Sequence, residues 1–82
     1  MNNVEYRMHI AAGRAYGVAS ACDSKVDYGS ERTADKAAER MSARSDHRLE
    51  AYPCAFCFGW HIGRALTPTE QAKFRARLIP AH

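Results

Sequence analysis

The 82-residue sequence has no long apolar run and an odd, small number of cysteines. No stretch approaches the roughly 18 apolar residues that a membrane-spanning helix needs, and the first residues lack the basic-then-apolar order of a signal peptide. Three cysteines disfavour a disulfide framework, because such frameworks use even numbers in secreted proteins. We therefore expect a cytoplasmic protein in a reducing compartment, without membrane contact.

The motifs of the common enzyme classes are also missing. There is no Gly-rich phosphate loop and no H-E-x-x-H helix. Pro53-Cys54-x-x-Cys57 matches the second half of the zinc deaminase signature, which also needs H-x-E well upstream. The nearest candidate, His47-Arg-Leu-Glu50, has the wrong spacing and lies only a few residues before the cysteines. We therefore expect no enzymatic activity and no small-molecule substrate.

One stretch concentrates two thiols, an imidazole and the only tryptophan: Tyr52-Pro-Cys54-Ala-Phe-Cys57-Phe-Gly-Trp60-His61-Ile-Gly63. Two cysteines separated by two residues can direct both sulfur atoms at one ion across a tight turn. Gly59 then lets the chain reverse, so that His61 arrives from the returning strand. The stretch predicts three ligands of a structural Zn²⁺: Cys54, Cys57 and His61.

A structural zinc takes four protein ligands, so one more residue is needed. Cys22, the remaining cysteine, is the leading candidate, and His47 competes because it is close in sequence and lies in a polar linker. His9 and His82 are weaker rivals, since one lies in an Ala-rich helix and the other is the last residue. The opposing interpretation treats the cysteines as small buried apolar residues. A Cys54–Cys57 redox pair is disfavoured because no long buried strand precedes it.

A wider pattern combines Lys25-Val-Asp-Tyr28-Gly-Ser30, an Ala-rich helix ending near Met41, and Tyr52-x-Cys54-x-x-Cys57-x-Gly59-Trp60-His61-x-Gly63. This pattern, over roughly residues 22–64, resembles the small, mostly uncharacterised zinc-finger-like proteins of bacteria and their phages. The resemblance implies that Cys22, which precedes the first strand, is the partner of the later C-x2-C and W-H. It implies little about function. Phe58 departs from the pattern, because a small or polar residue is expected after the second cysteine.

The spacing of apolar residues predicts three helices. The first spans residues 2–21, and its apolar face consists of Val4, Met8, Ala11 or Ala12, Ala15, and Val18 or Ala19. Two glycines loosen its second half, because each costs about 1 kcal/mol relative to alanine. The second helix runs from Glu31 to Ala43 and is capped by Ser30. Its apolar row consists of Ala34, Ala37 or Ala38, and Met41.

The third helix begins after a capping box at Thr67-Pro68-Thr69-Glu70 and runs to about Leu78, before Pro80 stops it. We expect Phe74 and Leu78 to dock this helix on the rest of the domain.

Alternation of apolar and polar residues predicts three short strands, Lys25 to Tyr28, Leu49 to Tyr52 and Trp60 to Gly63. The last two form an antiparallel hairpin around the cysteine turn. The expected fold is a small zinc-stabilised α+β domain in which a short β-hairpin with a zinc knuckle packs against the central helix. We expect one domain over residues 1–82: an N-terminal helix at 1–21, a zinc-finger-like core at 22–64 and a basic C-terminal helix at 65–82.

The formal net charge of +3 is unevenly distributed along the chain. In the central helix, basic residues interleave with acidic ones, which is typical of a solvated face. No acidic residue follows Glu70, so a basic cluster near the C-terminus is not neutralised there: Arg64, Lys73, Arg75 and Arg77. Basic residues bind phosphates, and exposed aromatics such as Phe56 and Phe58 stack on unpaired bases. The cluster predicts a nucleic-acid-binding module.

The alternative is a protein-binding module, such as a small phage or bacterial factor that binds and modulates a larger host complex. Its support is the apolar Phe58 at the knuckle and the small-residue face of the N-terminal helix, because an apolar tip rimmed by charge suits a binding hot spot. Ionic strength separates the two functions, since phosphate binding weakens steeply with salt.

Overall fold

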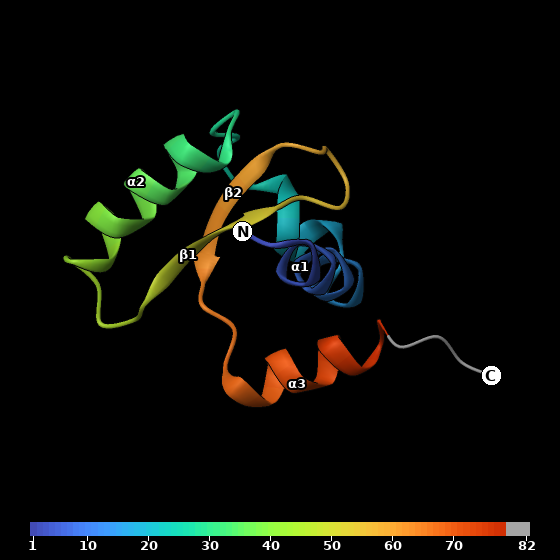
Figure 1. The fold of residues 1–82 in the computed structure, drawn as a ribbon. Coiled ribbons are helices and arrows are strands. Elements are labelled where there is room, and N and C mark those ends of the chain that lie inside the picture. The colour runs from blue at the N-terminus through green and yellow to red at the C-terminus, as the bar shows by residue number, and fades with distance from the viewer. Residues whose placement is uncertain (79–82) are drawn as a thin grey trace.

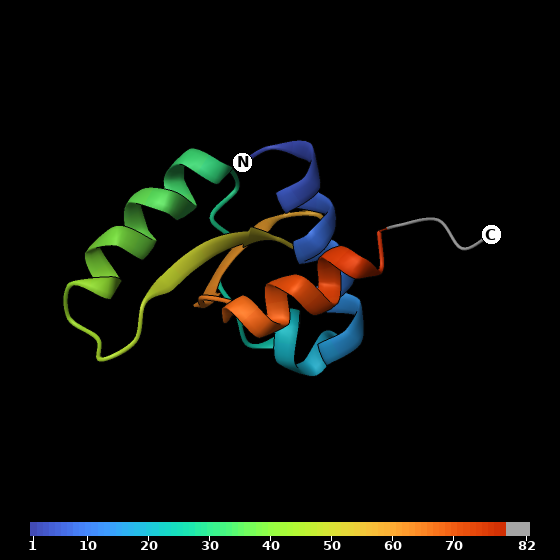
Figure 2. The ribbon, with the colours of Figure 1, turned by 60° about the horizontal axis from the view of Figure 1, so that its bottom comes forward.

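The structure is a computed structural model, and it describes residues 1–78. Its elements follow in the order α1 (Asn3–Tyr16), η1 (Ala19–Asp23), α2 (Glu31–Ser42), β1 (Leu49–Pro53), β2 (Trp60–Arg64) and α3 (Pro68–Ala76). β1 and β2 form an antiparallel hairpin, with α2 on one side and α1 and α3 on the other (Figures 1 and 2). The predicted α+β class is confirmed. Within the described residues, no helix is both long and apolar enough to cross a bilayer.

The hairpin runs in register from Leu49 paired with Arg64 to Pro53 paired with Trp60. Proline has no N–H to donate, so it suits the last pair before the turn. Alternate side chains of the two strands face α2 and pack on three of its alanines, which lets the helix approach the sheet closely. This alanine core consists of Ala34, Ala37, Ala38, Ala51 and Ile62, with Leu49 and Trp60 at its edge. The two predicted strands of the hairpin are confirmed.

Helix α2 begins where predicted, at Ser30, whose hydroxyl accepts a hydrogen bond from the Thr33 N–H at 3.2 Å. At its other end, the Ser42 hydroxyl bonds the N–H and C=O of Leu49 at 2.9 and 3.1 Å and so ties the helix to β1. The prediction that Met41 extends the apolar row is wrong, because its side chain is 43% exposed. The hairpin ends at the Leu49–Arg64 pair, so no further strand pair covers the last turn of α2.

Helix α1 is shorter than predicted and buries a different face. It ends at Gly17, whose φ of +91° no longer fits a helix. The buried residues are Met8, His9, Ala12 and Gly13, whereas Val4 and Ala15 are exposed. Two neighbours set this face, because α1 packs on the hairpin with one side and on α3 with the other.

Helix α3 has the predicted capping box, in which Thr67 and Glu70 bond each other's backbone N–H groups. Phe74 is 0% exposed and packs with Met8 and Ala12 of α1, while Leu66 and Leu78 close the cluster. The predicted docking of this helix through Phe74 and Leu78 is confirmed. Pro80, predicted to stop the helix, lies outside the described residues.

The predicted strand from Lys25 to Tyr28 is wrong. Residues 25–28 lie beside β2, but only one main-chain hydrogen bond joins the two segments. It runs from the Tyr28 N–H to the Trp60 carbonyl at 2.9 Å. Side chains occupy the other bonding positions: Asp27 accepts from the Trp60 N–H, and the His61 ring bonds the Val26 carbonyl. Val26, which the alternation assigned to this strand, is 63% exposed. Cys22 accordingly lies in the π-helical turn η1 rather than at the start of a strand.

Candidate metal centre

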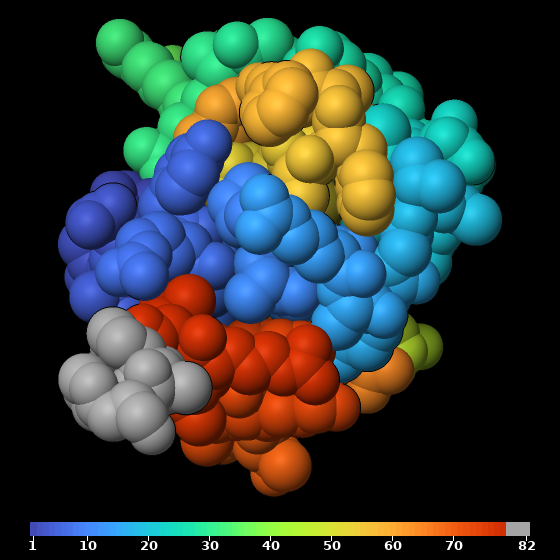
Figure 3. All heavy atoms as spheres, turned by 90° about the vertical axis from the view of Figure 1, so that its right-hand side faces the viewer, coloured from blue at the N-terminus to red at the C-terminus, as the bar shows by residue number. Residues whose placement is uncertain are grey.

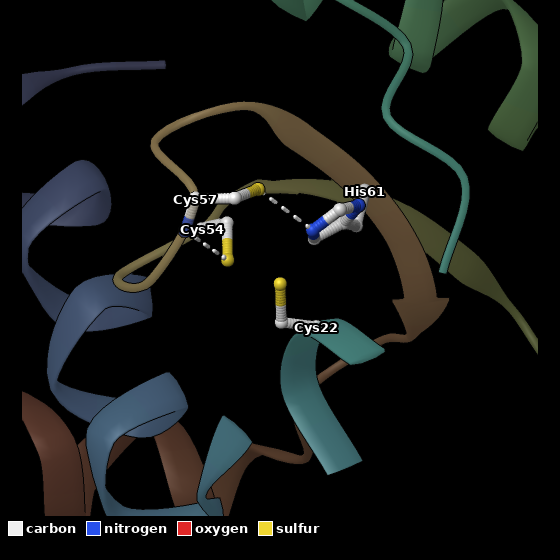
Figure 4. Close-up of side chains that lie close together, drawn as sticks. All are labelled: Cys22, Cys54, Cys57 and His61. Carbon is white, nitrogen blue, oxygen red and sulfur yellow. Dashed lines mark hydrogen bonds between the residues drawn. The ribbon is translucent and has the colours of Figure 1, made fainter. Parts of the chain in front are cut away.

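Four side chains predicted as metal ligands lie together at the turn end of the hairpin. Cys22 comes from η1, Cys54 and Cys57 from the turn between the strands, and His61 from β2 (Figure 4). Their ligand atoms all lie within 4.8 Å of one another. In a tetrahedral site with Zn–S bonds of about 2.3 Å, ligand atoms are about 3.5–4 Å apart. The group could therefore hold a metal ion with only small side-chain shifts.

The fourth member of this group is Cys22, and the competing histidines lie elsewhere. His47 is exposed in the loop before β1, beyond the Leu49–Arg64 end of the hairpin, whereas the cysteines lie beyond its other end. His9 is buried and directs Nε2 at Glu50, with 3.6 Å to the carboxylate. His82 lies outside the described residues.

The Cys54 sulfur is held by the backbone of its own turn. It accepts N–H bonds from Phe56 at 3.3 Å and from Cys57 at 3.4 Å. Burial raises the pKa of Cys54, but the N–H groups of Cys57 and Phe56 and the neighbouring thiols outweigh burial and bring the pKa to about 7. The turn thus favours a thiolate, the form in which cysteine binds metal.

Cys22 shows the opposite shift. Its hydrogen bond to Cys54, then burial and the contact with Cys57, raise its pKa to about 12. Three sulfur atoms this close cannot all be anionic without a neighbouring cation, since like charges repel strongly when partly desolvated. A divalent ion would remove that repulsion and allow all three to act as thiolates.

His61 is buried and fixed in the orientation of a ligand. Its Nδ1 lies 2.7 Å from the Val26 carbonyl, which can only accept, so Nδ1 carries the proton. Nε2 then has a free lone pair and lies 3.3 Å from the Cys57 sulfur. Metal-bound histidines show this arrangement, because the second hydrogen bond sets the tautomer and the ring plane. The role of Val26 was missed from the sequence, where this residue was assigned to a strand.

Asp27 is a second supporting residue that the sequence analysis missed. Its Oδ1 accepts from the N–H groups of Gly29 at 2.8 Å and Trp60 at 3.2 Å. These N–H groups, Gly29 first, lower the pKa of the Asp27 carboxyl. A Cβ at Gly59 would overlap this carboxylate, so a larger residue there would have to displace the Asp27 side chain. The Asp27-x-Gly29 spacing of a side-chain turn was the available signal.

Tyr52 supports the group from the hairpin. Its hydroxyl donates to the Ala21 carbonyl at 2.6 Å, directly before Cys22, and so fixes η1 on β1. Burial, followed by the charges of the three cysteines, raises the pKa of Tyr52 to about 12, so it stays a donor over the physiological range. The four ligands thus belong to segments that hydrogen bonds hold independently of any ion.

The predicted contact residues lie outside the ligand set, and all are exposed: Phe58, Arg64, Lys73, Arg75 and Arg77. Lys73 and Arg77 lie over the Phe74 ring, with their charged groups 5.5 and 5.1 Å from its centroid. Phe58 lies in the turn between the strands, next to Cys57, and is 81% exposed.

Comparison of the chain with protein-family models, with curated proteins and with solved structures found no match. The resemblance to zinc-finger-like proteins of bacteria and phages therefore stays a prediction. The chemical capacity of the site follows from its own geometry. If all four side chains bound one ion, they would complete a tetrahedron and leave no coordination position for water, as in structural metal sites.

Proposed function

We propose that this chain is a small zinc-stabilised module that binds nucleic acid and catalyses no reaction. The observation that carries the proposal is the charge difference between the two sides of the hairpin. Helices α1 and α3, with the cap residue Arg77, carry five basic and two acidic residues, whereas α2 carries three of each. We use the name basic face for the exposed surfaces of α1, α3 and the α3 cap that carry these five basic residues: Arg7, Arg14, Lys73, Arg75 and Arg77.

Zinc is the ion that best fits the ligand set. Three thiolates and an imidazole are soft to intermediate ligands, and tetrahedral Cys₃His is one of the standard structural zinc sets. A reducing cytoplasm keeps such thiols available, which agrees with the expected compartment. With all four positions filled by protein, the ion supports the fold rather than a reaction.

The basic face is suited to phosphate. Within residues 1–78, none of its side chains forms a salt bridge with an acidic residue. The two acidic residues on the same helices are engaged in internal hydrogen bonds: Glu5 with Asn2, and Glu70 with Thr67 and with Tyr16 of α1. Arginine and lysine without an internal partner offer charge and several N–H donors to a polyanion. Arg64, on β2, is exposed as well and extends the positive charge beyond α3.

The test is fluorescence anisotropy with labelled oligonucleotides at increasing salt. Arg75→Ala combined with Arg77→Ala should weaken binding about tenfold or more and reduce the slope of log K against log[salt] by about one per lost phosphate contact. The matched control is Arg32→Ala combined with Lys36→Ala on α2, which removes the same charge. If both pairs of substitutions weaken binding equally, or neither does, the basic face is not the binding surface.

A protein partner is the second candidate, and exposed apolar side chains near the metal group favour it. Phe58 and Val26 are both largely exposed on segments that the ligands hold in place. An apolar hot spot binds with little salt dependence, so affinity that persists at high salt would favour this candidate.

A further inference from the structure

Phe58 occupies a position that the fold alone does not explain. Its backbone φ is +63°, in the left-handed region that disfavours residues with a Cβ, and it is the only such residue other than glycine in residues 1–78. Its ring is 81% exposed and adds nothing to either apolar cluster. Glycine or asparagine would suit the backbone better. A strained backbone that carries an exposed aromatic ring is a common sign of a contact residue.

The turn that carries Phe58 lies along α1. A Cβ placed on Gly13 of α1 would lie 3.7 Å from the Cβ of Ala55, and the Tyr6 ring packs against Trp60 with centroids 6.2 Å apart. Figure 3 shows the turn in yellow and orange, α1 in blue and α3 in red, one beside another on one face of the molecule.

One row of α1 residues faces this turn, and another row faces α3. Between these rows, on the outer surface of the helix, two arginines are exposed to solvent. Arg7 and Arg14 are seven residues apart, two helical turns, so both lie on this outer strip. Lys73 and Arg77 continue the positive charge on α3, where both flank the Phe74 ring. The turn that carries the exposed Phe58 ring thus lies along a helix whose outer strip is positively charged.

We propose that this face binds single-stranded nucleic acid, with an unpaired base stacked on Phe58 and the adjoining phosphates on the basic face. The proposal rests on the nucleic-acid function proposed above and names its substrate class. Phenylalanine has no polar group with which to read base edges in a groove, so its gain comes from stacking. In a duplex, both faces of each base are already covered by neighbours, whereas a single strand offers the base and the phosphates together.

The ligand group holds the backbone that carries the ring. Phe58 directly follows Cys57, and the next residue, Gly59, is held by the bond from the Cys54 N–H to its carbonyl at 2.9 Å. A metal ion on Cys57 and His61 would clamp the chain on both sides of Phe58. A ring on a backbone held in this way loses less freedom on stacking than one on a mobile loop, which is the advantage of a preorganised contact.

Fluorescence anisotropy with four fluorescein-labelled probes of equal length tests the proposal. The probes are a mixed-sequence DNA strand, its RNA counterpart, the DNA duplex and a strand in which abasic sites replace the central bases. The wild-type protein should bind both single strands at least about fivefold more tightly than the duplex or the abasic strand. A difference between the DNA and RNA strands identifies which single strand is preferred.

Phe58→Gly is the informative variant, because it relieves the backbone strain. It should melt at or above the wild-type temperature and retain its metal, yet bind the intact single strands about five- to tenfold more weakly, with little change for the abasic strand. Met41→Ala, an exposed apolar residue of α2, is the matched control and should leave all four affinities unchanged.

The outcomes separate the two proposals. If wild-type protein binds all four probes alike and Phe58→Gly binds as tightly, the stacking proposal fails, while the effect of Arg75→Ala with Arg77→Ala can still support nucleic-acid binding. If wild-type protein binds none of the probes, both proposals fail and Phe58 becomes a candidate contact for a protein partner.

Discussion

The two sides of the hairpin are covered in different ways. On the α2 side, three alanines meet Ala51 and Ile62, and the charges of the helix balance. On the other side, Phe74 and Met8 join α1 to α3, and the outer surfaces of both helices are basic. The first side combines close packing with a neutral surface, whereas the second carries the charge that we assign to binding.

The small side chains of the α2 side explain why a bound metal would add stability. Hydrophobic stabilisation scales with apolar area, and alanine contributes little area per residue. Chains only slightly longer than about 80 residues have small cores, and a metal is one of the constraints that stabilise such domains. The four ligands join η1, the turn and β2, and η1 leads through residues 25–28 into α2. An ion there would connect the two sides of the hairpin.

Loss of a ligand should have the largest effect. Cys54→Ser removes a buried sulfur to which two N–H groups donate, and structural zinc sites supply about 10–16 kcal/mol of folding free energy in small domains. That exceeds or matches the whole stability of a typical domain, about 5–15 kcal/mol. We expect the cooperative thermal transition, followed by circular dichroism, to disappear. The exposed Ser20→Ala is the control, and a wild-type-like transition in Cys54→Ser would contradict the organising role of the site.

Phe74→Ala should affect one side of the hairpin only. Removing a fully buried phenylalanine costs about 3–5 kcal/mol, which we expect to see as a lower urea midpoint. The metal content should stay at one ion per chain, because Phe74 contacts α1 and not the ligands. If Phe74→Ala loses the ion as well as the docking of α3, the two sides of the hairpin fold as one unit.

Gly59→Ala should lower stability by a smaller amount, and a second substitution should restore most of the loss. The added Cβ overlaps the Asp27 carboxylate, and forced overpacking costs about 1–3 kcal/mol. In an Asp27→Ala background the same substitution should cost much less, since the overlapping atoms are gone. Urea unfolding of the two single variants and the double variant measures this coupling, and additive effects would show that Asp27 does not limit the space at Gly59.

Much of the fold could be predicted because its signals are local. Ser30 and the capping box at Thr67 fix two helix starts, and Pro53 and Gly59 bound the turn of the hairpin. The cysteine and histidine spacing likewise indicated the group of four side chains that could hold a metal.

The failures lie where side chains from other segments decide the structure. The strand expected at residues 25–28 did not form, because the Asp27 carboxylate and the His61 ring take the bonds that a neighbouring strand would have made. The buried face of α1 depends on contacts with both α3 and the hairpin, which its own periodicity does not encode. The positive φ of Phe58 was equally hidden, since this conformation usually belongs to glycine.

Native mass spectrometry of the wild-type protein and of Cys22→Ser, with His47→Ala as the control, tests the central claim most directly. We predict one zinc per chain in the wild type and in His47→Ala, and loss or strong weakening of zinc binding in Cys22→Ser. A wild-type protein without zinc, or a Cys22→Ser variant that retains it as firmly as His47→Ala, would contradict the account of a four-ligand centre that organises this fold.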